Sequence, residues 1–131
     1  MEMKLAAAKR LLRHHRDSQQ DTTWQPASRE FLDSQIEAAV SRMTPPQSRL
    51  WQSIQVPPQK WAQHPYGDLG GGFWVVALMG QTVVWYNDLE DGFNYSAFTK
   101  YGTIDAYWCD QDRLEWTIQR LLNVVTTGAE A

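Results

Sequence analysis

The hydrophobic pattern is strongest between residues 73 and 87, where two apolar runs are joined at Gly80 and Gln81. A two-residue loop that begins with glycine is typical of a type II′ turn, because glycine adopts the positive φ of the first central position without steric cost. The pattern therefore predicts a β-hairpin with strands at residues 73–79 and 82–87.

Counting outward from this turn pairs the two strands without interruption. The predicted pairs are Met79–Thr82, Leu78–Val83, Ala77–Val84, Val76–Trp85, Val75–Tyr86 and Trp74–Asn87. Side chains alternate between the two faces of a strand. One face is predicted to carry Phe73, Val75, Ala77, Met79, Val84 and Tyr86, and the other Trp74, Val76, Leu78, Val83 and Trp85. Neither face is polar, so both need cover, from the chain's own helices or from a partner.

Two further strands are predicted after the hairpin, at residues 93–98 and 103–108. The second alternates cleanly, with Ile104, Ala106 and Trp108 on one side, a pattern that suits an outer strand. Together with the hairpin, these segments predict a four-stranded antiparallel meander.

Helical periodicity marks four other segments, at residues 3–16, 27–43, 47–55 and 111–125. Asp110 is a good N-cap for the last of them, because a short acidic side chain accepts hydrogen bonds from the first helical amides. Helices followed by a run of strands and one closing helix predict an α+β fold.

The segment between the third helix and the hairpin shows no clear period. Val56-Pro57-Pro58 is predicted to break the chain, since proline lacks the backbone N–H and restricts the residue before it. Residues 59–69 are expected to form an ordered loop, and the glycines at 70–72 a tight lead-in to the first hairpin strand.

The length of 131 residues suits one domain that buries roughly two-thirds of its unfolded surface without a metal or disulfide. We divide the chain into a basic amphipathic helical arm at residues 1–16, a polar linker at 17–25 and a single α+β domain at 26–131. Most of the seven Trp and five Tyr are expected in the core.

Charge is unevenly spread along the chain. Residues 1–60 hold nine basic and six acidic residues, whereas residues 61–131 hold three basic and nine acidic ones. The acidic half repels phosphate backbones and favours basic or neutral partners. Nucleic-acid binding would have to use the arm alone, and membrane binding is not expected, because the arm's apolar stripe lacks Trp and Phe and no apolar run reaches membrane length.

Cys109 is the lone cysteine, which excludes an internal disulfide and fits a reducing, cytoplasmic compartment. Asp110, Asp112 and Glu115 follow it and favour the protonated thiol. His64 is the only plausible base for a Cys-His pair, and we expect a structural cysteine. No catalytic or cofactor motif is present, so the chain gives no reason to expect an enzyme, and no cofactor or bound metal is predicted.

A group of carboxylates follows the hairpin. Asp88, Glu90 and Asp91, with Asn87 and Asn94 nearby, supply oxygen ligands of the kind that Ca²⁺ or Mg²⁺ binds. They lack the spacing of a calcium loop, and Asp and Asn are common for reasons of turn chemistry. We interpret them as a turn whose carboxylates border a surface for a basic partner.

The candidate binding residues combine this turn with the nearby aromatics: Trp61, His64, Tyr66, Trp74, Trp85, Asp88, Glu90, Asp91, Tyr95 and Tyr107. The aromatics form either core alone or core plus one recognition face. The leading hypothesis is a small cytoplasmic protein–protein interaction module with an acidic Trp- and Tyr-rich sheet surface, including self-association. The alternatives are a small-ligand-binding protein or enzyme with a pocket near His64, Cys109 and the carboxylates at 88–91, and a nucleic-acid-associated protein that uses the arm.

Overall fold

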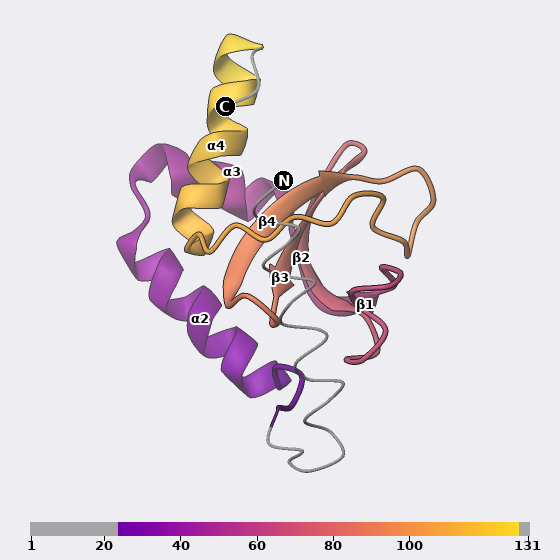
Figure 1. The fold of residues 1–131 in the computed structure, drawn as a ribbon. Helices are drawn as coiled ribbons and strands as arrows, with labels where there is room; N and C mark the ends of the chain where they lie inside the picture. The colour runs from indigo at the N-terminus through magenta and orange to yellow at the C-terminus, as the bar shows by residue number, and fades with distance from the viewer. Residues whose placement is uncertain (1–23, 129–131) are drawn as a thin grey trace.

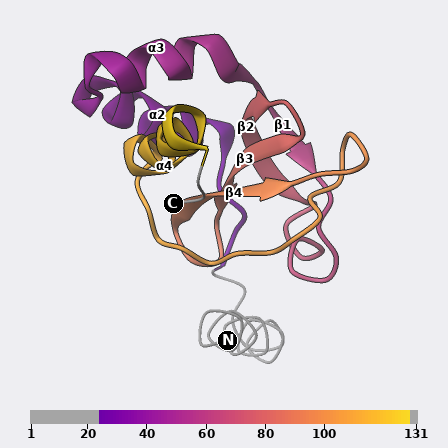
Figure 2. The ribbon, with the colours of Figure 1, turned by 90° about the horizontal axis from the view of Figure 1, so that it is seen from above.

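A computed structural model describes residues 24–128 of the chain and has an α+β fold, as the sequence predicts. Its elements are α2 (Arg29–Arg42), α3 (Pro45–Ile54), β1 (Gln55–Trp61), β2 (Phe73–Met79), β3 (Thr82–Asn87), β4 (Gly92–Ala97) and α4 (Leu114–Thr127). The strands form an antiparallel meander in the order β1-β2-β3-β4. The helices cover one face of this sheet and long loops cross the other (Figures 1 and 2). The predicted helix at 3–16 and most of the linker lie outside the described residues.

The first strand of the sheet is β1, a segment that the sequence analysis assigned to a helix end, a break and a loop. It pairs with β2, and its register is irregular between Gln55 and Gln59. Pro57 and Pro58 lie within this irregular stretch. An edge strand tolerates proline, because the N–H facing away from the sheet has no ladder partner to lose.

The predicted strand at 103–108 is wrong. Only Thr103 makes a bridge there, a parallel one to Ala62, and the Asp105 N–H donates to the carbonyl of Ala97 at the end of β4. Gly102, with a φ of 98°, turns the chain into this path. Ile104 and Tyr107 are buried against the sheet while Trp108 is exposed, which is not the predicted alternation.

The β2–β3 hairpin has the predicted turn, with a φ of 60° at Gly80. The pairs from Met79–Thr82 to Ala77–Val84 are confirmed. Beyond them the register shifts by one residue, so that Val75 faces Trp85 and Trp74 faces Tyr86. Val76 is the extra residue of this β-bulge. As a result, residues 73–76 of β2 lie on the opposite face of the sheet from the predicted one.

The bulge sorts the hairpin into two cores that differ from the predicted faces. The helix-side core contains Leu32, Ala39, Trp51, Ile54, Val76, Ala77, Val84, Tyr86, Phe93, Leu114, Ile118 and Leu121. The loop-side core contains Trp61, Phe73, Val75, Val83, Trp85, Leu89, Ile104, Tyr107 and Cys109. Both faces of the hairpin are therefore covered by the chain itself. Neither face needs a second copy or a partner to cover it.

Local capping sets where the helices begin and end. Ser28 caps α2 by accepting the Phe31 amide, and Gly128 ends α4 in the left-handed region with a φ of 72°. Helix α4 begins at Leu114 with Arg113 as its N-cap residue, not after Asp110 as predicted. Asp110 is instead held by Asn94 and by Arg120. Among residues 24–128, no helix combines the length and apolar character needed to cross a membrane.

Gly92 is required where the segment before α4 crosses the start of β4. A Cβ at this position would collide with the Cα of Gln111 and the carbonyl oxygen of Asp110. We expect Gly92→Ala to lower the free energy of unfolding by more than ~2 kcal/mol, because both obstacles are backbone atoms. Urea denaturation measures this. Gly71→Asn is the control, since the space around Gly71 is open and Asn tolerates its positive φ; a Gly92→Ala protein as stable as this control would contradict the assignment.

Candidate functional site

The turn between β3 and β4 is built on the buried side chain of Asn87. Its amide nitrogen donates to the Tyr107 hydroxyl at 2.9 Å and to the Trp108 carbonyl at 3.0 Å. Its amide oxygen accepts from the backbone N–H groups of Leu89 and Glu90. One side chain thus shapes the turn and fixes it to the loop that crosses the sheet.

Asn94 makes the corresponding connection one strand later. Its side chain donates to the Asp110 carbonyl at 3.1 Å and accepts from the Asp110 N–H at 2.9 Å. Both asparagines therefore serve turn and loop geometry, and no group of three His, Cys, Asp or Glu side chains within residues 24–128 is placed to hold a metal ion.

The three carboxylates of the turn do not form one cluster on the surface. Asp88 and Glu90 are buried, and Asp91 is exposed. Asp91 has a φ of 59°, a left-handed conformation that Asp and Asn adopt more readily than other side chains. Of the predicted rim carboxylates, only Asp91 lies at an exposed edge.

Asp88 holds the chain that enters α2. Its carboxylate accepts the Ala27 N–H at 2.8 Å, and its carbonyl oxygen accepts the Trp24 indole N–H at 3.4 Å. The Trp74 indole donates to the Ala27 carbonyl at 2.7 Å. Residues 24–28 are thereby fixed against the turn and against β2. Trp24, which the sequence analysis placed in the linker, packs on the loop-side core.

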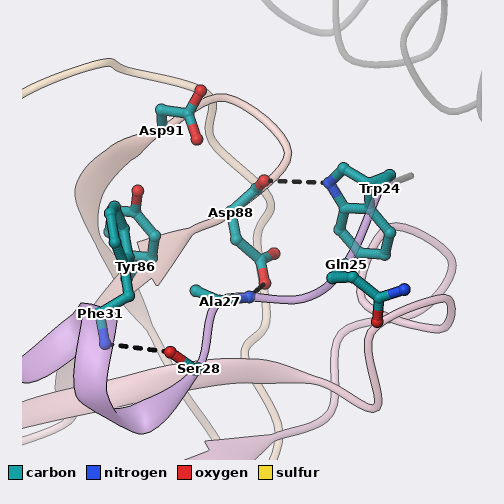
Figure 3. Close-up of a pocket in the computed structure, with 8 residues that line it drawn as sticks. All are labelled: Trp24, Gln25, Ala27, Ser28, Phe31, Tyr86, Asp88 and Asp91. Atoms are coloured by element: carbon teal, nitrogen blue, oxygen red, sulfur yellow. Dashed lines mark hydrogen bonds between the residues drawn. The ribbon is translucent and has the colours of Figure 1, made fainter.

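A cavity of about 390 Å³ opens between this entering segment and the turn (Figure 3). We call it the aromatic-acidic pocket; it is lined by Trp24, Gln25, Ala27, Ser28, Phe31, Tyr86, Asp88 and Asp91. The rings of Phe31 and Tyr86 lie 6.1 Å apart, and 45% of Phe31 is exposed. Figure 3 shows Asp91 above the Tyr86 ring and Asp88 between that ring and Trp24.

The electrostatics of the pocket are negative. Burial raises the pKa of the Asp88 carboxyl, and the charge of Lys60 acts in the opposite direction. Burial also raises the pKa of the Tyr86 hydroxyl, and the charges of Asp91 and Asp88 raise it further. The ammonium of Lys60 is directed elsewhere, to the carbonyl oxygens of Gly70 and Gly72 at 3.0 and 3.4 Å.

Aromatic rings beside carboxylates form a recognised kind of cation site. The ring faces of Phe and Tyr carry negative potential and attract ammonium or guanidinium groups, and a nearby carboxylate adds a direct charge contact. The pocket holds no pair of a nucleophile and a base, so its geometry supports binding more directly than chemistry.

Most of the predicted recognition aromatics belong to the core. Trp61, Trp85 and Tyr107 are buried, and the Trp85 indole donates to the Ser96 hydroxyl at 3.0 Å. Tyr66 stacks on Tyr107, with ring centroids 4.0 Å apart. Two others, Trp74 and Tyr95, are partly buried, and each lies under a cation, Lys60 in one case and Arg120 in the other.

The residues of the alternative pocket have separate partners. His64 is exposed and its Nδ1 lies 2.6 Å from the Asp68 carboxylate. Cys109 is buried in the loop-side core. Asp88 is engaged by Ala27, so none of the hydrogen bonds described for these three side chains joins them to one another.

Sequence reasoning found Asp88 and Asp91 but not the rings beside them. Tyr86 was expected on one apolar face of the hairpin, Phe31 was given no role in binding, and Trp24 was placed in the linker. Residues 24–31 meet residues 86–91 only through tertiary packing, and no local pattern signals a contact at that separation. No protein-family model, curated protein or solved structure matches this chain.

The Cys109 thiol is expected to be unreactive in the folded protein. Burial, followed by the charges of Glu90 and Asp110, raises its pKa to about 11. Only the thiolate is nucleophilic, so alkylation by iodoacetamide at pH 8 should be on the order of a hundredfold slower in the native protein than in urea. Mass spectrometry of timed samples measures both rates. Comparable rates in the folded and unfolded protein would show that the thiol is accessible and ionised.

The buried Asp88 carboxylate predicts a specific pH dependence. A pKa above the ordinary value means that the native state binds this proton more tightly than the unfolded chain does, so the contribution of Asp88 to stability rises as pH falls. Asp88→Asn keeps an oxygen that can accept the Ala27 N–H and removes the titration. We expect the wild type to gain stability relative to Asp88→Asn as pH falls from the raised folded pKa toward the ordinary value.

Urea unfolding of both proteins between pH 3 and 7 tests this, and titrating groups that do not interact with Asp88 cancel in the difference. Parallel curves would mean that Asp88 has an ordinary pKa in the folded protein. A wild type that loses relative stability at low pH would mean that its pKa is lowered.

Proposed function

We propose that this protein is a small interaction module that binds a basic protein partner by receiving a lysine or arginine side chain in the aromatic-acidic pocket. The observation that carries the proposal is the placement of the partly exposed Phe31 ring and the Tyr86 ring beside Asp88 and Asp91 in one cavity.

The charge distribution of the chain supports a basic partner. The half of the sequence that contains the pocket carboxylates has an excess of acidic residues. Such a surface accelerates the approach of a positively charged protein and repels phosphate backbones. The pocket then supplies the local contact, because a desolvated cation over aromatic rings gains both ring and carboxylate attraction.

The partner in this proposal is a different protein. Self-association was expected because an apolar sheet face needed cover, and the chain's own helices and loops supply that cover. The edge of β4 is also occupied, since Phe93 pairs with Asp112 and the Asp105 N–H donates to the Ala97 carbonyl. A cytoplasmic setting belongs to the proposal and rests on the single cysteine.

The nucleic-acid hypothesis depends on residues 1–16, which lie outside the described part of the chain. The small-ligand hypothesis required His64, Cys109 and Asp88 to meet, and each has a separate environment. The pocket at α2 is consequently the better-supported site.

A matched pair of small probes tests the pocket. N-acetyl-lysine amide and N-acetyl-norleucine amide have side chains of similar length and differ in charge. We expect only the lysine probe to shift the NMR signals of the Trp24 indole and of the Ala27 and Asp91 amides at millimolar concentration. Asp91→Asn should weaken binding about two- to fivefold, the effect of one exposed charge contact, while the left-handed conformation at this position remains available to Asn.

Two further variants complete the experiment. Phe31→Leu keeps an apolar side chain without an aromatic face and should also weaken lysine binding about two- to fivefold. Asp105→Asn removes the same charge from an exposed site outside the pocket and should bind like the wild type. Equal shifts with both probes, or equal loss in Asp105→Asn and Asp91→Asn, would refute the proposed function.

A further inference from the structure

A second cleft lies beside the aromatic-acidic pocket and is lined in part by α2. It has a volume of about 250 Å³ and shares Tyr86 and Asp91 with the first cavity. Its walls include Gln35, Ala38 and Arg42 from α2, Phe93 from β4, and Gln111 and Arg113 from the segment before α4.

One row of rings joins the two cavities. Tyr86 lies 6.1 Å from Phe31 and 4.9 Å from Phe93 between ring centroids. Because Tyr86 and Asp91 line both cavities, the two lie side by side, and we call the pair the α2 groove.

The far end of the α2 groove contains two guanidinium groups, those of Arg42 and Arg113. Glu115 accepts from Arg42 at 2.6 Å and lies 3.5 Å from the Nε of Arg113. The Glu115 side chain is only 6% exposed, whereas the side chains of Arg42 and Arg113 are 40% and 50% exposed. Two cations therefore share one buried carboxylate, and both arginine side chains are partly exposed. The Arg113 guanidinium also lies over the Trp116 ring, 4.2 Å from its centroid.

A carboxylate also lines this end. Asp112 is bound by Arg120 at 3.1 Å, and Arg120 also binds Asp110 at 2.9 Å. The Asp112 side chain is 28% exposed, about half as much as that of Arg113. The arginines are therefore more accessible to a ligand than Asp112 is.

The walls between the two ends suit a peptide backbone. Gln35 and Gln111 are exposed on opposite sides of the cleft, and each side-chain amide offers donors and an acceptor. Between Phe31 and Arg42, α2 extends about 16 Å at 1.5 Å per residue. An extended chain covers that distance in about five residues.

We propose that the α2 groove binds an extended segment of the protein partner, with a lysine or arginine at one end and a glutamate or aspartate about five residues away. This inference rests on the proposed function of the aromatic-acidic pocket and adds the second charge and its spacing. Aspartate and aromatic groups receive the cation, and Arg42 and Arg113 receive the carboxylate.

Synthetic six-residue peptides with blocked ends test the spacing and the charge order. Each has lysine at one end, four serine or alanine residues in the middle, and glutamate, glutamine or lysine at the other end, in both chain directions. In low salt, we expect the better glutamate peptide to bind about two- to fivefold more tightly than its glutamine counterpart, as one additional exposed ion pair allows. A glutamate peptide with two middle residues should lose this advantage.

Variants assign the effect to the two ends of the groove. Arg113→Gln should remove the difference between the glutamate and glutamine peptides, and α4 should persist because the Arg113 side chain makes no capping hydrogen bond. Arg49→Gln is the matched control, since Arg49 is exposed on α3 and does not line the groove. Asp91→Asn should weaken all lysine-containing peptides by a similar factor. NMR titration followed at Phe93 and Gln111 reports the far end, and titration followed at Ala27 reports the near end.

The outcomes separate the two proposals. Equal affinity of the glutamate and glutamine peptides, or tightest binding of the peptide with lysine at both ends, overturns the inference on the far end and leaves the cation pocket standing. Binding that does not depend on lysine, or the absence of binding by every peptide, overturns both.

Discussion

The structure depends on one constraint, the need to cover both faces of the β2–β3 hairpin. Both faces are lined by Val, Trp, Phe and Tyr side chains, so exposing either face to water would be unfavourable. Three helices cover one face of the described domain. The other face receives loops, and loops can cover a sheet only if their backbone polar groups find partners. Asn87 and Asn94 supply those partners for the segment at 107–110, and so the buried amides beside the turn follow directly from the apolar hairpin.

The aromatic-acidic pocket is a consequence of the same arrangement. Asn87 holds the turn at 88–91 through the backbone N–H groups of Leu89 and Glu90, and the Asp88 carboxylate faces the chain entering α2 and accepts the Ala27 N–H. Burial makes that ionised carboxylate costly, which its raised pKa reflects. A cation in the pocket would offset part of this cost. The feature that fixes the start of α2 thus also places a buried carboxylate beside the partly exposed Phe31 ring.

Features of the fold that depend on neighbouring residues in the sequence could be predicted, and features that depend on tertiary contacts could not. The α+β class and the hairpin turn at Gly80 follow from local patterns and were predicted correctly. The bulge at Val76 depends on how β2 packs against the helices, and no local pattern marks it. The prolines in β1 indicated a break because their tolerance depends on that strand lying at an edge. The site divides in the same way: Asp91 was recognised from its turn, whereas Trp24, Phe31 and Tyr86 meet only after folding.

The positions of Cys109 and His64 favour the interpretation of the protein as a binding module over its interpretation as an enzyme. Catalysis by Cys109 would need an ionised, accessible thiol beside a base, and burial keeps this thiol protonated. His64 is paired with Asp68 on an exposed loop, away from that thiol's buried environment. The near cavity carries Asp88 and Asp91, and the far cavity carries Arg42 and Arg113 together with the less exposed Asp112, over a shared ring floor. In the proposed groove, a ligand would be selected by the order and spacing of its own charges. A single exposed ion pair is weak by itself, so under this proposal affinity increases when both ends are occupied together.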